Sequence, residues 1–84
     1  GESPREKLEG DLQLEHVAHE DLKATVKCCE DVGDYVSRDL AKRILDAEEE
    51  HIDWLETQLS LMDRVGEQNY LQTAMKTVKP SEGS

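Results

Sequence analysis

Glu48 and His51 are spaced so that a carboxylate and an imidazole can act on one ligand. Residues three apart lie about one turn from each other on an α-helix, so the two side chains of this Glu-x-x-His pair share a side. On a helical wheel of about 100° per residue, the apolar residues near Glu48 are Ile44, Leu55, Leu59 and Met62. Because an unpartnered carboxylate on an apolar face is unfavourable, we expect Glu48 to be neutralised, paired or bound to a metal ion.

A second carboxylate, Glu15, repeats this placement earlier in the chain. It lies near the centre of an apolar stripe that includes Leu8, Leu22 and Val26. His19, one turn further on, shares the general face, and we expect it to be structural or exposed rather than a ligand. His16 points well to the side of the stripe and is expected to be solvated.

Metal binding is the chemistry that this pattern favours. A Glu on one helix and a Glu-x-x-His on its neighbour form half of the ligand set of di-iron carboxylate bundles. The alternative is a solvated acidic run over residues 48–50, with His51 as an ordinary helix residue. Glu15 lies about 17 residues before a predicted turn and Glu48 about 15 after it, so both stand roughly 23 to 26 Å from that turn. In an antiparallel hairpin the two carboxylates are therefore level, which favours the metal site.

Two long helices and one short helix must position these residues. The segment Ser3-Pro4-Arg5-Glu6 has the cap, first-turn Pro and Glu of a capping box, and it predicts a helix start. Residues 31–34, with Gly33, predict the turn, and a second helix is expected from about Tyr35 to Arg64, ended by Gly66. A short final helix is expected near residues 67–76. We therefore expect one helical domain over residues 1–76 and a flexible tail over residues 77–84.

Two helices of about 30 residues cannot bury a wide apolar stripe alone and need two more helices. If two hairpins pair about a two-fold axis, the bundle holds two copies each of Glu15, Glu48 and His51. Four carboxylates and two imidazoles suit two iron ions, with carboxylates bridging them. The sequence thus predicts an all-α hairpin that another chain completes.

The composition of the chain limits which kinds of partner it can bind and indicates its compartment. The chain has 84 residues, a formal net charge of -10 and no Phe, so its core must be aliphatic. The acidic balance argues against nucleic acid and anionic membrane surfaces as partners. No apolar run approaches the roughly 20 residues of a membrane span, and no signal-peptide pattern opens the sequence. Adjacent Cys28 and Cys29 cannot easily bridge each other and are interpreted as small core residues. We expect a soluble, cytoplasmic protein.

Several segments of this sequence resemble the C-terminal half of bacterioferritin. They are residues 34–39, 44–45, 48–56 and 68–72, and residues 11–15 fit the same family. The resemblance covers roughly residues 1–75 and implies a ferritin-like fold. It implies that Glu15 is the iron ligand of the third bundle helix, Glu48 the bridging carboxylate of the fourth, and His51 its imidazole ligand. The short final helix resembles the fifth helix, which lines the four-fold channels of a 24-subunit shell, with Asn69 and Gln72 as polar channel residues.

The resemblance also implies a function and a partner. The family chain is about twice as long, and its first half supplies the other Glu, the other Glu-x-x-His and the Met that ligates haem. Met62 and Met75 do not occupy that Met motif, so any haem in the assembly would need its ligand from elsewhere. The implied function is an iron-storage and detoxification subunit that oxidises Fe(II) with oxygen or peroxide at a di-iron site. A complementary N-terminal-half chain would complete it. The alternatives are a two-fold homodimer with the same ferroxidase chemistry and a non-catalytic structural subunit or fragment.

Overall fold

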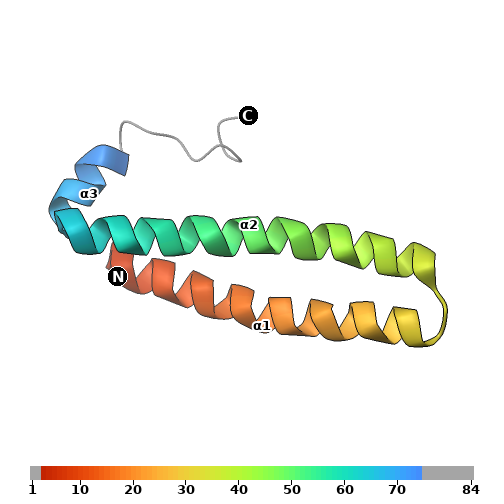
Figure 1. Ribbon diagram of the computed structural model, residues 1–84. Coiled ribbons are helices and arrows are strands. Elements are labelled where there is room, and N and C mark those ends of the chain that lie inside the picture. The colour runs from red at the N-terminus through yellow and green to blue at the C-terminus, as the bar shows by residue number, and fades with distance from the viewer. Residues whose placement is uncertain (1–2, 75–84) are drawn as a thin grey trace.

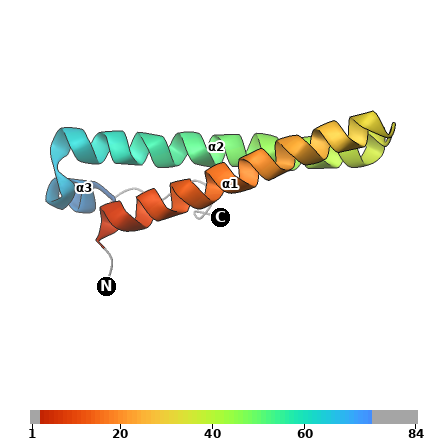
Figure 2. The ribbon, with the colours of Figure 1, turned by 90° about the horizontal axis from the view of Figure 1, so that it is seen from below.

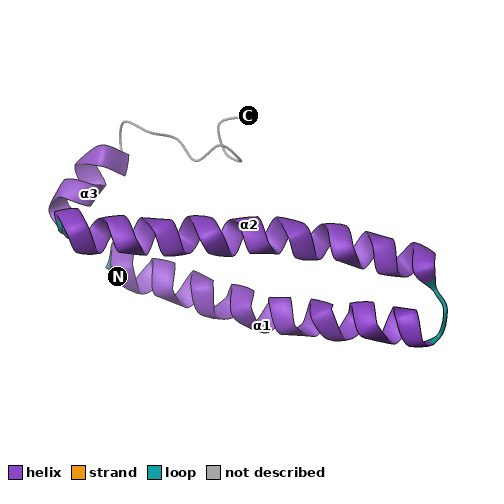
Figure 3. Ribbon diagram, viewed as in Figure 1, coloured by secondary structure: helices purple, strands orange, loops and turns teal. Residues whose placement is uncertain are grey.

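The computed structural model describes residues 3–74, which form two long antiparallel helices and a short third one (Figure 1). Helix α1 spans Pro4–Asp31, α2 spans Tyr35–Val65 and α3 spans Glu67–Ala74. Figure 3 shows no strand in this described part of the chain. The predicted all-α fold is confirmed. The predicted flexible tail, residues 77–84, lies outside the described residues, as do residues 75 and 76 of the predicted final helix.

Helix α1 begins where its capping signals predict. The Ser3 hydroxyl accepts a hydrogen bond from the Glu6 backbone N–H at 3.1 Å, and the Glu6 carboxylate accepts one from the Ser3 N–H at 3.2 Å. This capping box satisfies two backbone N–H groups that the first helical turn leaves without partners. Pro4 follows at the first helical position, where its missing N–H costs nothing.

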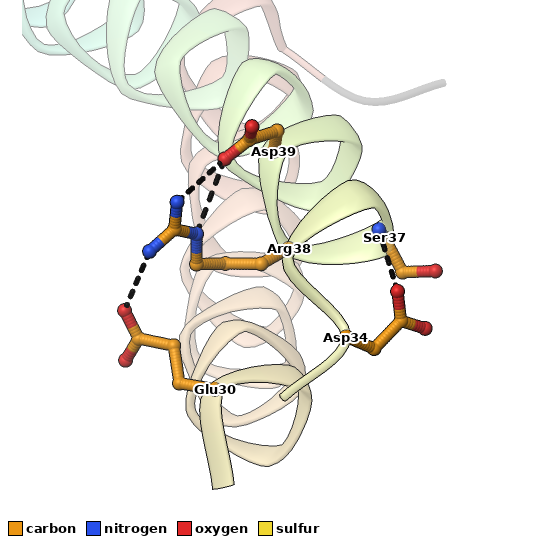
Figure 4. A network of polar contacts seen from close by, with 5 residues as sticks. All are labelled: Glu30, Asp34, Ser37, Arg38 and Asp39. Atoms are coloured by element: carbon orange, nitrogen blue, oxygen red, sulfur yellow. Dashed lines mark hydrogen bonds and ion pairs between the residues drawn. The ribbon is translucent and has the colours of Figure 1, made fainter. Parts of the chain in front are cut away.

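The turn between α1 and α2 is held by backbone and side-chain contacts at the far end of the hairpin. Gly33 adopts a positive φ of 75°, which favours a residue without a Cβ. Asp34 then caps α2 by accepting a hydrogen bond from the Ser37 N–H at 3.1 Å. Interaction with the Ser37 side chain, followed by this backbone bond, lowers the pKa of Asp34. Arg38 reaches back to Glu30 of α1 and also bonds Asp39 (Figure 4). These contacts fix the chain reversal.

Helices α1 and α2 pack along their length and cross at a visible angle (Figures 1 and 2). The fully covered core is small and lies mainly on α2. Its members are Ala41, Leu55, Met62 and Tyr70. Two helices can cover each other along only one line, so most other apolar positions remain partly open.

Helix α3 is docked at the end of the hairpin that is opposite the turn. Gly66, with a φ of 84°, separates it from α2. Tyr70 is buried, and its hydroxyl donates a hydrogen bond to Gln58 Oε1 at 3.0 Å. The Arg5 backbone N–H donates to Glu67 Oε1 at 3.1 Å, so the start of α1 also holds α3.

A set of large apolar side chains is exposed on the hairpin. On α2 they include residues at helical spacing within the predicted stripe: Val36, Leu40 and Ile44. Their exposure means that the stripe is wider than one partner helix can cover, as expected for half of a bundle. None of the described helices is both long and apolar enough to cross a membrane.

Candidate metal centre

Glu15, Glu48 and His51 lie together in the middle of the hairpin. Glu15 comes from α1 and the other two from α2, and all three side chains are partly buried. Glu15 Oε2 lies 3.5 Å from His51 Nδ1 across the two helices. The antiparallel register therefore places the predicted carboxylates and imidazole at one level, as the chain positions suggest.

Glu48 is the most perturbed carboxylate of this group. Partial burial raises its pKa, and the charge of Glu15 together with a hydrogen bond to Glu15 raises it further. The charges of His19 and His51 act in the opposite direction. Two carboxylates held close in a partly dehydrated site favour a proton or a metal cation between them. The raised pKa of Glu48 thus follows from its closeness to Glu15, and a bound cation would relieve the repulsion between the two carboxylates.

One hairpin does not form a complete coordination shell. Among residues 3–74, no three His, Cys, Asp or Glu side chains are arranged to hold a metal ion by themselves. In this hairpin Glu15 and His51 contact each other directly, and a bound cation would take the place of that contact. Two carboxylates and one imidazole are nevertheless donors that suit Fe(II), and the chemistry of this donor set fits the predicted iron site.

A second interhelical contact lies beside these three residues, and the sequence did not predict it. His19 Nε2 of α1 lies 2.8 Å from Glu49 Oε2 of α2. The His19 side chain is only 18 % exposed, whereas Glu49 is 58 % exposed. His19, for which a structural role was expected, thus has Glu49 as a specific partner. His16 is exposed, as predicted.

A pocket of about 260 Å³ opens next to His51. It lies between the first turns of α1, the middle of α2 and Tyr70 of α3, and its walls are mostly apolar. Trp54 forms part of the wall, with its ring centroid 6.3 Å from that of His51. His51 therefore lies near both an aromatic ring, Trp54, and a carboxylate, Glu15.

The predicted channel residues lie on α3 and are exposed. Asn69 Nδ2 donates a hydrogen bond to the Val65 carbonyl at 2.8 Å, one turn back in the chain. Gln72 is exposed on the same helix. A channel needs several copies of this helix around one axis, so the channel role of both residues stays a prediction.

The two cysteines differ in their surroundings. Cys29 is half-buried, and burial followed by the charge of Asp34 raises its pKa, which disfavours the reactive thiolate. Cys28 is exposed, so the prediction that it packs in the core is wrong for this hairpin. The reason is its position at the flank of the stripe, which α2 does not reach.

Comparisons with known proteins match most of the chain. A family model described as a ferritin-like domain matches residues 1–65. A bacterial ferritin of Neisseria meningitidis serogroup A is 46 % identical over 69 residues, which are 81 % of this chain and 45 % of that protein. A bacterial ferritin of Synechocystis is 46 % identical over 76 residues, 89 % of this chain and 49 % of the relative. A bacterioferritin of Brucella melitensis is 44 % identical over 72 residues, 86 % of this chain and 45 % of the relative. The chain thus spans about half the length of the curated relatives that it matches.

Proposed function

The chain belongs to the ferritin-like family, a family of iron-storage proteins, and we propose that it is a subunit of a bacterioferritin-like cage that oxidises Fe(II) and stores ferric mineral. The observation that carries the proposal is the position of Glu15, Glu48 and His51 at one level of the hairpin. An iron-binding role gives a physical reason for placing two carboxylates within an apolar stripe.

The proposed site binds Fe(II) as its substrate. Glu48 and Glu15 supply negative charge that compensates the cation, and His51 supplies a neutral nitrogen donor. Oxygen or peroxide accepts the electrons as Fe(II) becomes Fe(III). Haem is not assigned to this chain, because the Met that holds it in the family has no counterpart among the residues that resemble bacterioferritin. The protein contributes fixed donor geometry and an entry path.

A second hairpin must complete the centre. The exposed residues Val36, Leu40 and Ile44 form the apolar surface that such a hairpin would cover. We propose that it comes from a complementary chain carrying another Glu and another Glu-x-x-His, or from a second copy of this chain. Asn69 and Gln72 would then line a four-fold channel of a 24-subunit shell. We place the proposed assembly in the cytoplasm, where thiols such as those of Cys28 and Cys29 are kept reduced.

A structural, non-catalytic subunit is the second candidate. It is favoured by the incomplete ligand set that the described residues of one hairpin present. In such a subunit Glu48 would bind no metal ion, and its replacement by an apolar residue would cause no loss of activity. The two functions therefore differ in the effect of the same substitution.

Native mass spectrometry of the purified assembly, followed by Fe(II) oxidation assays, tests the proposal. We expect either a second polypeptide or an even number of copies, and rapid oxygen consumption when Fe(II) is added. The variant Glu48→Gln should assemble but lose rapid oxidation, while Glu50→Gln, an exposed neighbour on the same helix, should retain it. Equal activity of Glu48→Gln and the unchanged chain would favour the structural subunit.

A further inference from the structure

We infer that His19 is a positioning residue of the proposed metal centre: its contact with Glu49 fixes the rotation of α2 against α1 that directs Glu48 toward Glu15. The inference rests on the proposed function. It concerns how the donors are held, and His19 itself is not assigned as a ligand.

The contact lies at the level of the site and joins the two helices directly. His19 follows Glu15 by one turn on α1, and Glu49 follows Glu48 in the chain. The 2.8 Å separation of His19 Nε2 and Glu49 Oε2 is that of a strong hydrogen bond. Because His19 is mostly buried, its ring has little freedom to leave this arrangement.

Before a cation binds, this bond and the contact between Glu15 and His51 bracket Glu48 from two sides. Around α2, Glu49 lies about 100° to one side of Glu48 and His51 about 60° to the other. Each of these two residues contacts a different side chain of α1. Rotation of α2 about its own axis in one direction breaks one contact, and rotation in the other direction breaks the second. Glu48, between them, is therefore held toward α1.

The place of this bond beside the donors makes such a device useful. Glu49 directly follows Glu48 in α2, so a contact that fixes Glu49 against α1 also restricts the direction in which Glu48 points. Residues that orient metal ligands from outside the coordination shell commonly change metal affinity about 10-fold to 100-fold when they are removed.

The chain offers a matched control for this bond. Arg38 and Glu30 also join α1 to α2 beside the turn, with Arg38 Nη1 3.4 Å from Glu30 Oε2 (Figure 4). Glu30 lies 15 residues from Glu15 along α1, so this contact is remote from the site. Removing either interhelical contact should weaken the hairpin. Only the His19 contact should alter metal binding.

The test measures Co²⁺ binding to the purified assembly by visible absorption, with thermal unfolding of the metal-free protein alongside. We expect His19→Leu to weaken Co²⁺ binding about 10-fold or more and to change the absorption spectrum. Glu30→Ala, which removes the control contact, should leave both the Co²⁺ affinity and the spectrum unchanged. His19→Gln should restore binding in large part, because the Gln amide can donate to Glu49 as the ring nitrogen does. Glu49→Ala removes the same bond from the other side and should reproduce the loss, even if His19→Leu fails to assemble.

The outcomes separate this inference from the proposed function. Unchanged Co²⁺ affinity and spectrum in both His19→Leu and Glu49→Ala would overturn the positioning role while leaving the metal centre intact. If Glu48→Gln binds Co²⁺ as tightly as the unchanged chain does, the proposed centre is overturned and the inference falls with it. Equal losses in His19→Leu and Glu30→Ala would show a general effect of helix pairing and would also overturn the inference.

Discussion

Glu15 Oε2 and His51 Nδ1 face each other across α1 and α2 at a distance of 3.5 Å. This relationship is long-range in the sequence and arises because Glu15 and His51 each lie 18 residues from Gly33 in an antiparallel hairpin. An insertion or deletion between Gly33 and either residue would move one past the other. The register of the hairpin is therefore a requirement of the candidate site.

Replacing Glu48 by Leu should affect the stability of the assembly and its Fe(II) oxidation in opposite directions. Glu48 lies in a partly dehydrated site beside Glu15, so an apolar residue removes both desolvation and repulsion. We expect Glu48→Leu to stabilise the metal-free assembly by about 1 kcal/mol while it abolishes rapid Fe(II) oxidation. Thermal unfolding and oxygen consumption measure the two effects. A stabilised variant with full activity would show that Glu48 is no ligand.

Asp34 gives the hairpin an acid-dependent contribution to stability. Interaction with the Ser37 side chain, followed by the hydrogen bond from the Ser37 N–H, lowers its pKa below the value in the unfolded chain, so the ionised form stabilises the folded state. This contribution is present above the unfolded-state pKa and is lost as the pH falls through the lowered folded-state pKa. We expect Asp34→Asn to keep the cap at neutral pH but to lack this acid-dependent loss.

Circular dichroism melts at several pH values compare the two proteins. The difference in melting temperature between them should change in the acidic range and stay constant above it. The control is Asp39→Asn, an exposed carboxylate on α2 that contacts the Arg38 side chain instead of capping the backbone. If Asp34→Asn follows the unchanged chain at every pH, the cap does not titrate as described.

The helices could be predicted from local signals, whereas the contacts between them could not. Ser3 and Gly33 act on neighbouring backbone, so the sequence shows where α1 begins and ends. The contact between His19 and Glu49 depends on how α2 is rotated against α1, which the helical wheel of one helix does not contain. The wheel predicted an apolar stripe that one hairpin could not bury, but for the same reason it did not show that Leu40 and Ile44 would be among the residues left exposed.

Leu40 tests whether the exposed apolar residues of α2 are covered in an assembly. The side chain is 54 % exposed in the hairpin, so a charged residue should be tolerated by the hairpin itself. In a completed bundle that charge would be buried without a partner, which costs several kcal/mol. We expect Leu40→Glu to reduce the association constant of the assembly by at least about 10-fold.

Size-exclusion chromatography with native mass spectrometry measures this loss. Val32→Glu is the matched control, because Val32 is 73 % exposed but lies at the turn, beyond the end of α1. The control should assemble normally. Normal assembly of Leu40→Glu would place the partner surface elsewhere on the hairpin.

Tyr70 links α3 to the rest of the hairpin, and its hydroxyl makes a separable contribution. The ring is buried and the hydroxyl donates to Gln58 Oε1 at 3.0 Å. Tyr70→Phe keeps the ring and removes one hydrogen bond, so we expect α3 docking to weaken by about 1 kcal/mol. Hydrogen exchange should become several-fold faster in residues 67–72 and remain unchanged in the middle of α1. Tyr35→Phe, which alters an exposed tyrosine at the start of α2, is the control and should leave exchange in α3 unchanged. Unchanged exchange in Tyr70→Phe would mean that the apolar ring and the contact between Arg5 and Glu67 are sufficient to hold α3.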